Sequence, residues 1–385
     1  PIKVIQDATL SVRNGRVTFA GSQNEATIQD GDTQVDLGGR ALIPGLIDSH
    51  THIVFAGDRM DEMARRTRGE TYEEIAKAGG GIIRSVEALR HTAFDDIVNQ
   101  SQKRLQHMLS RGTTTIEIKT GYGLEPKLEN LQLDVIDELR ESVSNNTIFA
   151  TVLAHVIAPH RRDNRKEYID EFCQEVLEPA ASQKRVQFCD VFVESGAYTP
   201  DECIYICEKA KALGLQIKLH VDQLHEGGGA ALAAELGALS ADHLEMTSAD
   251  GRQALAQAGT MATILPGCGL FLGGENWPNG RALRDAGCEV AVATDCNPGS
   301  SMVADLPLCA TMAATQGGLS LEEAIWGITR GGAKALGLHD RGTLDIGDRA
   351  YFIVLEHKDW RSLLYNPAAA PIHSVFIEGQ KKFGN

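Results

Sequence analysis

Hydrophobic positions divide most of the chain into short apolar runs that alternate with longer amphipathic stretches. Between about residues 113 and 298 the runs are rich in β-branched residues, and stretches such as NLQLDVIDELRES repeat their apolar residues with helical spacing. Strands separated by helices are typical of parallel βαβ units. With one earlier run, the pattern predicts eight strands, at residues 41–52, 113–119, 147–157, 185–195, 216–222, 239–245, 260–267 and 289–295.

Eight such units favour a closed (β/α)8 barrel of the TIM type over an open sheet. A doubly wound sheet needs a glycine-rich phosphate loop after its first strand, and the sequence has none there. Residues 1–40 and 340–385 instead carry short alternating runs, with a hairpin expected at Asn14-Gly15. We therefore expect an α/β protein with a barrel over residues 41–339. The two ends are expected to meet in one small sheet beside it, as a small β-sandwich domain.

Composition narrows the class of protein. The 385 residues are 43% hydrophobic and 23% charged, as in globular proteins with a sizeable core. A formal net charge of −15 argues against sequence-independent nucleic-acid binding, which needs a basic face. No apolar run approaches the ~20 residues that span a bilayer, no signal peptide is recognised, and the eight cysteines lack CxxC spacing. These features predict a cytoplasmic protein with reduced thiols and no membrane partner.

Five polar residues fall at the carboxyl ends of expected strands, where barrels of this type carry their chemistry. His50 and His52 end the first strand, and their alternate positions place both on one face. His220, His243 and Asp295 lie at or near the ends of the fifth, sixth and eighth strands. A single histidine at a strand end is more often a hydrogen-bonded structural residue. Four imidazoles and a carboxylate at one rim favour a metal site instead, and both zinc and iron accept such ligands.

Several longer segments resemble a known family. PGLIDSHTH, with the later histidines and the aspartate, resembles the amidohydrolase superfamily. Within it, HTHIVFAGDR, EIKTGYGL, GALSADHLE and ATDCNPGSS in combination resemble the imidazolonepropionases, and the likeness extends over about residues 41–356. The resemblance implies metal-dependent hydrolysis of the ring amide C–N bond of 4-imidazolone-5-propanoate to N-formimidoyl-L-glutamate, in histidine degradation. By analogy, it also implies a homodimer.

The resemblance assigns roles to individual residues. It implies one divalent or trivalent ion, zinc or iron, held by His50, His52, His220 and Asp295. His243 would lie just outside and stabilise the oxyanion, while Asp295 would also move protons. An isolated arginine is usually solvated and a tyrosine between glycines usually forms a turn, so the remaining roles depend on the resemblance. Substrate contacts are implied for Arg59 on the propionate, and for Tyr122, His155, Gln223, Asn297, Gly299 and Ser300.

Three further polar residues are expected near the barrel mouth, and the position of lysines bears on the number of metals. Some amidohydrolases bridge two ions with a lysine on a middle strand, but the fourth expected strand has no lysine beyond its start, so one ion is favoured. Lys119 is interpreted as a polar residue at the barrel rim. Glu117 and Glu194 would either orient the histidines or make only structural hydrogen bonds.

Two other functions remain open alternatives. A heterocyclic aminohydrolase (deaminase) of the same superfamily would use the same fold and metal. Arg59 with Tyr122 and NPGSS favours a substrate that bears a carboxylate, and therefore favours the ring-opening enzyme. A barrel that binds without catalysis would have no need of Asp295 beside the histidines.

Overall fold

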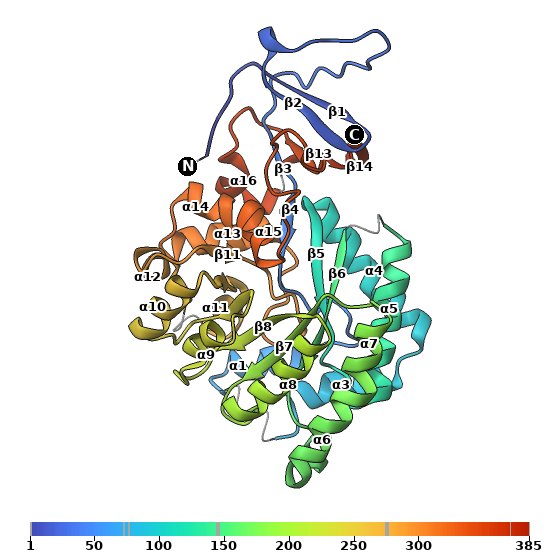
Figure 1. The fold of residues 1–385 in the computed structure, drawn as a ribbon, viewed down its shortest axis with the longest axis vertical. Helices are drawn as coiled ribbons and strands as arrows, with labels where there is room; N and C mark the ends of the chain where they lie inside the picture. Colours follow the sequence, from blue (N-terminus) through green and yellow to red (C-terminus); the bar gives the residue numbers. More distant parts are fainter. Residues whose placement is uncertain are drawn as a thin grey trace.

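Eight parallel strands form the centre of the protein in Figure 1, a computed structural model that describes residues 2–384 except 72–73, 76–77, 144–146, 274–276 and 370. The strands neighbour one another in chain order. The backbone N–H of His52 donates to Cys296 O, and that of Asp295 to His50 O, both at 3.0 Å, so the last strand returns to the first. The predicted (β/α)8 barrel is confirmed. Its strands are β4 (Leu46–Asp48), β5 (Thr113–Lys119), β6 (Ile148–Ala154), β7 (Phe188–Val193), β8 (Gln216–Val221), β9 (Ser240–His243), β10 (Met261–Ile264) and β11 (Val290–Val292).

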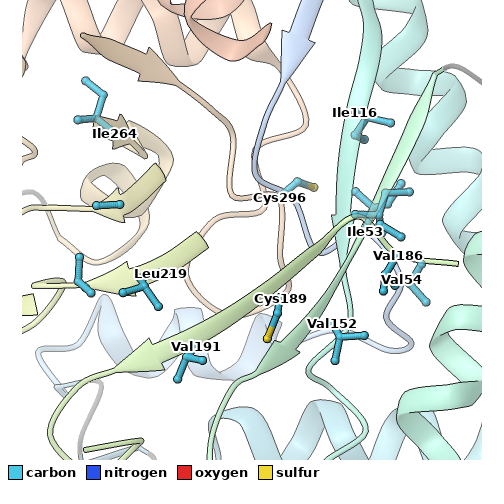
Figure 2. Close-up of a cluster of buried hydrophobic side chains, with 14 of the residues drawn as sticks. Ile53, Val54, Ile116, Val152, Val186, Cys189, Val191, Leu219, Ile264 and Cys296 are labelled. Atoms are coloured by element: carbon cyan, nitrogen blue, oxygen red, sulfur yellow. The ribbon is translucent and has the colours of Figure 1, made fainter. Parts of the chain in front are cut away.

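Alternation along each strand separates two buried environments. Leu219 on β8 and Val191 on β7 belong to the apolar layer between the strands and the helices, part of which Figure 2 shows. The intervening Lys218 and Asp190 are also fully buried, but they lie on the opposite faces of their strands. The inside of the barrel is therefore polar and charged, and the outside is apolar.

Helices cover the outer surface of the barrel. The longest are α4 (Phe94–Ser110), α5 (Pro126–Glu141) and α8 (Pro200–Ala212). The others are α1 (Met60–Arg66), α3 (Ile82–His91), α6 (Arg165–Phe172), α7 (Glu178–Ser182), α9 (Gly229–Glu235), α10 (Ala249–Ala258), α11 (Pro266–Phe271), α12 (Gly280–Asp285), α13 (Leu306–Thr315), α14 (Leu321–Trp326), α15 (Gly332–Ala335) and α16 (Ser362–Tyr365). Within the described ranges, no helix combines the length and apolarity needed to cross a membrane.

Local sequence explains several helix ends. Thr199 and Glu202 form a capping box at the start of α8, since each side chain accepts from the backbone N–H of the other. Pro126 begins α5, where the missing N–H costs nothing. Gly259 ends α10 in the left-handed conformation that glycine adopts readily.

The chain ends form two antiparallel sheets beside the barrel. One is a hairpin of β1 (Ala8–Arg13) and β2 (Arg16–Ser22), and its turn residues Asn14 and Gly15 both have positive φ, as expected for an Asn-Gly turn. The other sheet has the order β14-β13-β12-β3. Its strands are β3 (Leu42–Pro44), β12 (Phe352–Leu355), β13 (Ile372–Ile377) and β14 (Gln380–Gly384).

These two sheets correct one detail of the expectation. The ends do not share one sheet, but Val17 of the hairpin packs with Ala350, Phe352 and Val354 in a common core. The N–H of Val17 also donates to Asp348 O at 2.9 Å, and both ends lie together in Figure 1. The β-sandwich arrangement is therefore present.

The strand expected at residues 41–52 is divided in two. β3 pairs with β12 in the small sheet, whereas β4 pairs with β5 in the barrel. Gly45 separates them, and a Cβ at this position would lie 2.2 Å from Thr114 Oγ1. The domain boundaries at residues 40/41 and 339/340 stay a prediction.

Candidate metal centre and substrate cavity

Four of the expected ligand side chains converge at the carboxyl end of the barrel. His50 and His52 follow β4, His220 lies in β8 and Asp295 follows β11. Nε2 of His52 lies 3.3 Å from Nε2 of His50, and Asp295 Oδ1 lies 3.4 Å and 3.2 Å from Nε2 of His50 and His52. The ring centroids of His50 and His220 are 4.4 Å apart. Each of the four residues is at most 3% exposed, so their donor atoms meet in a buried pocket.

Unpaired nitrogens in this group fit a metal ion. Neither ring nitrogen of His220 has a hydrogen-bond partner, although Nδ1 lies 3.0 Å from Asp190 Oδ2. A buried polar atom without a partner is costly, and a bound cation removes that cost for a ring nitrogen. Three imidazoles and one carboxylate are also a donor set that zinc and iron accept. The residues present therefore fit one ion.

Two buried aspartates lie behind the histidines. Asp242 Oδ2 is 2.6 Å from His50 Nδ1, and this contact directs Nε2 of the same ring toward the centre. Asp190 Oδ2 approaches His220 in the same way. Sequence reasoning missed both aspartates. The available signal was an aspartate within a short, otherwise apolar strand. In the structure, Asp242 is paired in register with His220.

The buried charges correct one interpretation from the sequence and favour one of two alternatives for the glutamates. Lys119 is not at the rim but fully buried, and its Nζ donates to Glu117 Oε1 at 2.7 Å and to Asp190 Oδ2 at 2.8 Å. Glu117 contacts this lysine rather than a ligand histidine. Glu194 accepts from the backbone N–H of Leu224 at 2.9 Å and also pairs with His225, away from the ligands. Neither glutamate orients a histidine of the centre.

His243 lies beside the centre in an unusual backbone conformation. Its ring centroid is 5.4 Å from that of His220 and 5.8 Å from that of His50. Both His243 and Leu244 have positive φ, at 85° and 70°, which non-glycine residues adopt at a cost. The end of β9 therefore adopts a strained backbone conformation that directs this imidazole toward the cavity.

The cavity in front of the centre collects most of the expected substrate contacts. The residues that line it come from the loops after several strands, so the barrel brings together segments far apart in the sequence. Gly299 is the expected contact that does not line it. Of the expected site residues, the lining contains His52, Arg59, Tyr122, His155, His220, Gln223, His243, Asp295, Asn297 and Ser300.

Arg59 is held at one side of the cavity by Glu62. Its Nε and Nη2 both donate to Glu62 Oε2, at 2.8 Å and 2.6 Å, and Glu62 Oε1 accepts from the backbone N–H of Gly81. A Cβ at Gly299 would lie 2.1 Å from Arg59 Nη1. Gly299 therefore acts here by leaving room for the guanidinium, and Glu62 fixes its direction.

Tyr122 and His155 form another part of the lining, with ring centroids 5.6 Å apart. Burial lowers the pKa of His155 to about 3, so its ring is neutral. His155 Nδ1 lies 3.1 Å from the carbonyl oxygen of Gly121. Because a carbonyl only accepts, Nδ1 carries the proton, and Nε2 is left as an acceptor.

The loop that carries Tyr122 is held by a carboxylate that sequence reasoning missed. Glu129, near the start of α5, accepts from the backbone N–H groups of Gly121, Gly123 and Leu124 at 2.8–2.9 Å. A glutamate in the first turn of a helix after a glycine-rich loop was the signal that could have revealed it. α5 therefore sets the position of the tyrosine.

Asp295 receives several contacts on the side that faces away from the histidines. Its Oδ2 accepts from Asn297 Nδ2 at 2.8 Å and from the thiol of Cys268 at 2.9 Å. Burial by itself raises the pKa of this carboxyl group, but hydrogen bonds and charge from His50 and His52 hold the pKa well below its usual range. Asp295 is therefore an anion with one oxygen on each side.

Comparison with known proteins agrees with this centre. Residues 41–381 match the model of the amidohydrolase family. An imidazolonepropionase of Rhizobium rhizogenes is 40% identical over 98% of this chain and 94% of its own length, and one of a Bradyrhizobium species is 42% identical with the same coverage. The chain belongs to the amidohydrolase family and, within it, to the imidazolonepropionases.

Solved structures share the fold at lower identity. A triazine hydrolase variant has a TM-score of 0.79 with 18% identity, covering 98% of this chain and 90% of its own. The 5-methylcytosine deaminase of Klebsiella pneumoniae has a TM-score of 0.77 with 15% identity, covering 98% and 94%. At this identity the likeness shows the barrel fold, and the predicted roles of the site residues stay predictions.

Proposed function

We propose that this chain hydrolyses the ring amide C–N bond of 4-imidazolone-5-propanoate and releases N-formimidoyl-L-glutamate. One observation carries the proposal, namely that a single cavity joins a three-histidine, one-carboxylate centre to a fixed arginine. The centre suits attack on a carbonyl, and the arginine suits a carboxylate tail. Relatives at about 40% identity that are imidazolonepropionases support the same substrate.

A zinc or iron ion held by His50, His52, His220 and Asp295 would polarise the ring carbonyl and make water more acidic. We assign the proton transfers to Asp295. Oδ2 faces away from the histidines, so it accepts a proton from the water that adds to the carbonyl carbon. The same oxygen then returns the proton to the ring nitrogen as the C–N bond breaks, and one water is consumed. His243 stabilises the oxygen that becomes negative.

The other lining residues position the substrate. Arg59 binds the propionate, and its guanidinium is already oriented by Glu62, so little side-chain freedom is lost on binding. His155 offers an acceptor nitrogen to a ring N–H. Tyr122, Gln223, Asn297 and Ser300 supply further polar groups around the ring.

The substrate class, the cellular location, the metal content and the number of subunits are part of the same proposal. The substrate is a small molecule, and its hydrolysis is a step in histidine degradation. We propose a cytoplasmic homodimer that carries one zinc or iron ion in each subunit. Metal analysis of purified protein would distinguish the two metals, and sedimentation would give the number of subunits.

The decisive test is the loss of ultraviolet absorbance of freshly prepared 4-imidazolone-5-propanoate, with and without chelator. We expect turnover that chelator removes and that added zinc or iron restores, with N-formimidoyl-L-glutamate as the product by mass spectrometry. If metal-loaded protein leaves this substrate unchanged but releases ammonia from heterocyclic amines, the deaminase alternative replaces the proposal.

A further inference from the structure

Beside the proposed ion lies a second group of donors, which we call the thiol cluster: His243, Glu245 and Cys268. One donor atom from each lies within 4.8 Å of the other two. The side chains of His243 and Glu245 are 3% and 4% exposed, and Cys268 is equally buried. Neither Glu245 nor Cys268 has a role in the proposed hydrolysis.

Unpaired atoms in the thiol cluster point to a ligand. Both carboxylate oxygens of Glu245 and Nδ1 of His243 have no hydrogen-bond partner. Within the described part of the chain, Glu245 pairs with His243 alone, at 3.5 Å between Oε1 and Nδ1. A buried carboxylate is costly unless it is paired or binds a cation. The cluster therefore has the electrostatics of a cation site.

The donor types select a thiophilic ion. Cysteine sulfur, imidazole nitrogen and carboxylate oxygen are all zinc ligands, whereas magnesium and calcium prefer oxygen. Tetrahedral zinc, with ligand distances of about 2.0–2.3 Å, separates neighbouring donors by roughly 3.3–3.7 Å. The 3.5 Å between Nδ1 of His243 and Oε1 of Glu245 fits this spacing.

Asp295 connects the thiol cluster to the first centre. Its Oδ2 lies 2.9 Å from Cys268 Sγ, while its Oδ1 faces His50 and His52. Asp295 therefore lies beside the thiol of the second site, while the donor atoms that come within 4.8 Å of one another are those of His243, Glu245 and Cys268.

We propose that Nδ1 of His243, Glu245 and Cys268 form a second site for zinc or a similar thiophilic divalent ion, beside the outer oxygen of Asp295. Cys268 gives up its thiol proton to solvent when the ion binds. Occupation of this site inhibits hydrolysis, because the ion engages His243 and removes the thiol proton that Cys268 donates to the proton-moving oxygen of Asp295. This inhibition rests on the proposed function, whereas binding of the ion does not.

Titration of the metal-free protein with cobalt(II) chloride tests the site directly. We expect a second equivalent to bind and to produce the near-ultraviolet charge-transfer absorption of a cobalt–thiolate bond. Cys268→Ala should lose this absorption and the second equivalent, and Glu245→Gln should weaken the second equivalent at least 10-fold. Cys203→Ala is the matched control, since Cys203 is a buried thiol on α8 outside the cavity. This variant should keep the thiolate absorption and the second equivalent of cobalt.

The wild-type spectrum alone can overturn the proposal, whatever the stability of the variants. Absence of thiolate absorption in wild-type protein, or its persistence in Cys268→Ala, would refute the second site. Inhibition is read as the ratio of activities at excess and stoichiometric zinc. We expect the activity at excess zinc to fall below that at stoichiometric zinc in wild type and Cys203→Ala. In Cys268→Ala the ratio should stay near one. If no variant hydrolyses the substrate, the proposed function fails while the cobalt titration still decides the site.

Discussion

Asp295 uses its two carboxylate oxygens for different partners. Oδ1 faces the Nε2 atoms of His50 and His52, and Oδ2 accepts from Asn297 and Cys268. Under the proposed function this residue binds an ion with one oxygen and moves a proton with the other. Single residues of the centre are therefore expected to affect metal binding and turnover to different extents.

Asp295→Asn should reduce turnover at least 10²-fold, because an amide cannot accept the proton of the attacking water. Steady-state kinetics with the ultraviolet assay measure this loss, at a metal concentration that keeps the variant loaded. Asp305→Asn, which changes a carboxylate at the start of α13 outside the cavity, is the control and should retain turnover. A fully active Asp295→Asn enzyme would exclude Asp295 as the proton acceptor.

Arg59→Lys should raise KM by about 10- to 100-fold with a smaller change in kcat. Loss of a charge-assisted hydrogen-bonded pair costs about 1.5–3 kcal/mol, and lysine cannot bind a carboxylate with two parallel N–H groups. Arg65→Lys is a matched control in α1, the helix that follows Arg59, since Arg65 pairs with Glu70 at the half-exposed surface. An unchanged KM in Arg59→Lys would remove this arginine from propionate binding.

Asp242→Asn should lower metal affinity by about 10- to 100-fold, because Asp242 orients His50 and increases its basicity. Competition with a chromogenic chelator measures the affinity without any need for turnover. The same change at Asp170, which bonds Lys166 and Tyr205 at the surface, should leave it unaltered. Equal affinities in the two variants would show that the Asp242 contact does not support the ion.

At the scale of elements, the site depends on how helices hold the loops that follow the strands. Glu129 of α5 accepts three backbone hydrogen bonds from the loop after β5, and Gln132 Oε1 accepts a fourth from the N–H of Tyr122 at 3.0 Å. The loop is therefore part of one rigid unit with α5. Displacement of the helix start should carry the tyrosine with it.

Gly123→Ala tests this coupling. A Cβ at Gly123 would lie 2.4 Å from the backbone N of Glu129 and 2.7 Å from Leu128 C, so the loop or the helix must shift. We expect a loss of about 1–3 kcal/mol in the free energy of unfolding, together with a raised KM. Denaturant titration and kinetics measure the two effects. Gly227→Ala is the control, because its Cβ would meet nothing closer than 4.0 Å.

If Gly123→Ala and Gly227→Ala unfold at the same denaturant concentration, the loop has more room than its contacts indicate. The coupling of α5 to Tyr122 would then be wrong. A stability loss without any change in KM would instead separate the stability of the loop from its part in substrate binding.

At the scale of the whole molecule, the proposed ion lies where the barrel closes. The segments after β4 and β11 are joined by an isolated bridge between Thr51 and Cys296 rather than by a full ladder. His50, His52 and Asp295 come from these same segments, and His220 comes from the middle of the sheet. An ion that binds all four would therefore tie the closure of the barrel together.

Removal of the metal should lower the thermal stability of the protein. An ion that binds the folded state contributes about 4 kcal/mol at a free concentration 1,000 times its Kd. Calorimetry of chelated and reloaded protein measures this shift, and zinc or iron should restore the Tm whereas magnesium should not. An unchanged Tm after verified loss of the metal would show that the ion does not support the closure.

Local sequence determined much of this protein. Periods of apolar residues predicted all eight strands of the barrel, and polar residues at strand ends gave five candidates for a metal site, since parallel strands must end at one rim. The choice of four ligands among them followed from the family resemblance. Arg59, Tyr122, His155 and Asn297, which the resemblance implies as substrate contacts, line the cavity. Their roles followed from family resemblance and await the variants above.

Tertiary structure alone decided which side chains meet. His50 and Asp242 are 192 residues apart, and their contact depends on the register of strands across the barrel. The same dependence placed Lys119 inside the barrel, divided the first predicted strand at Gly45, and brought Cys268 to Asp295. A pattern along the chain shows which face of an element is buried, but the partner across that face is set by the packing of the whole barrel.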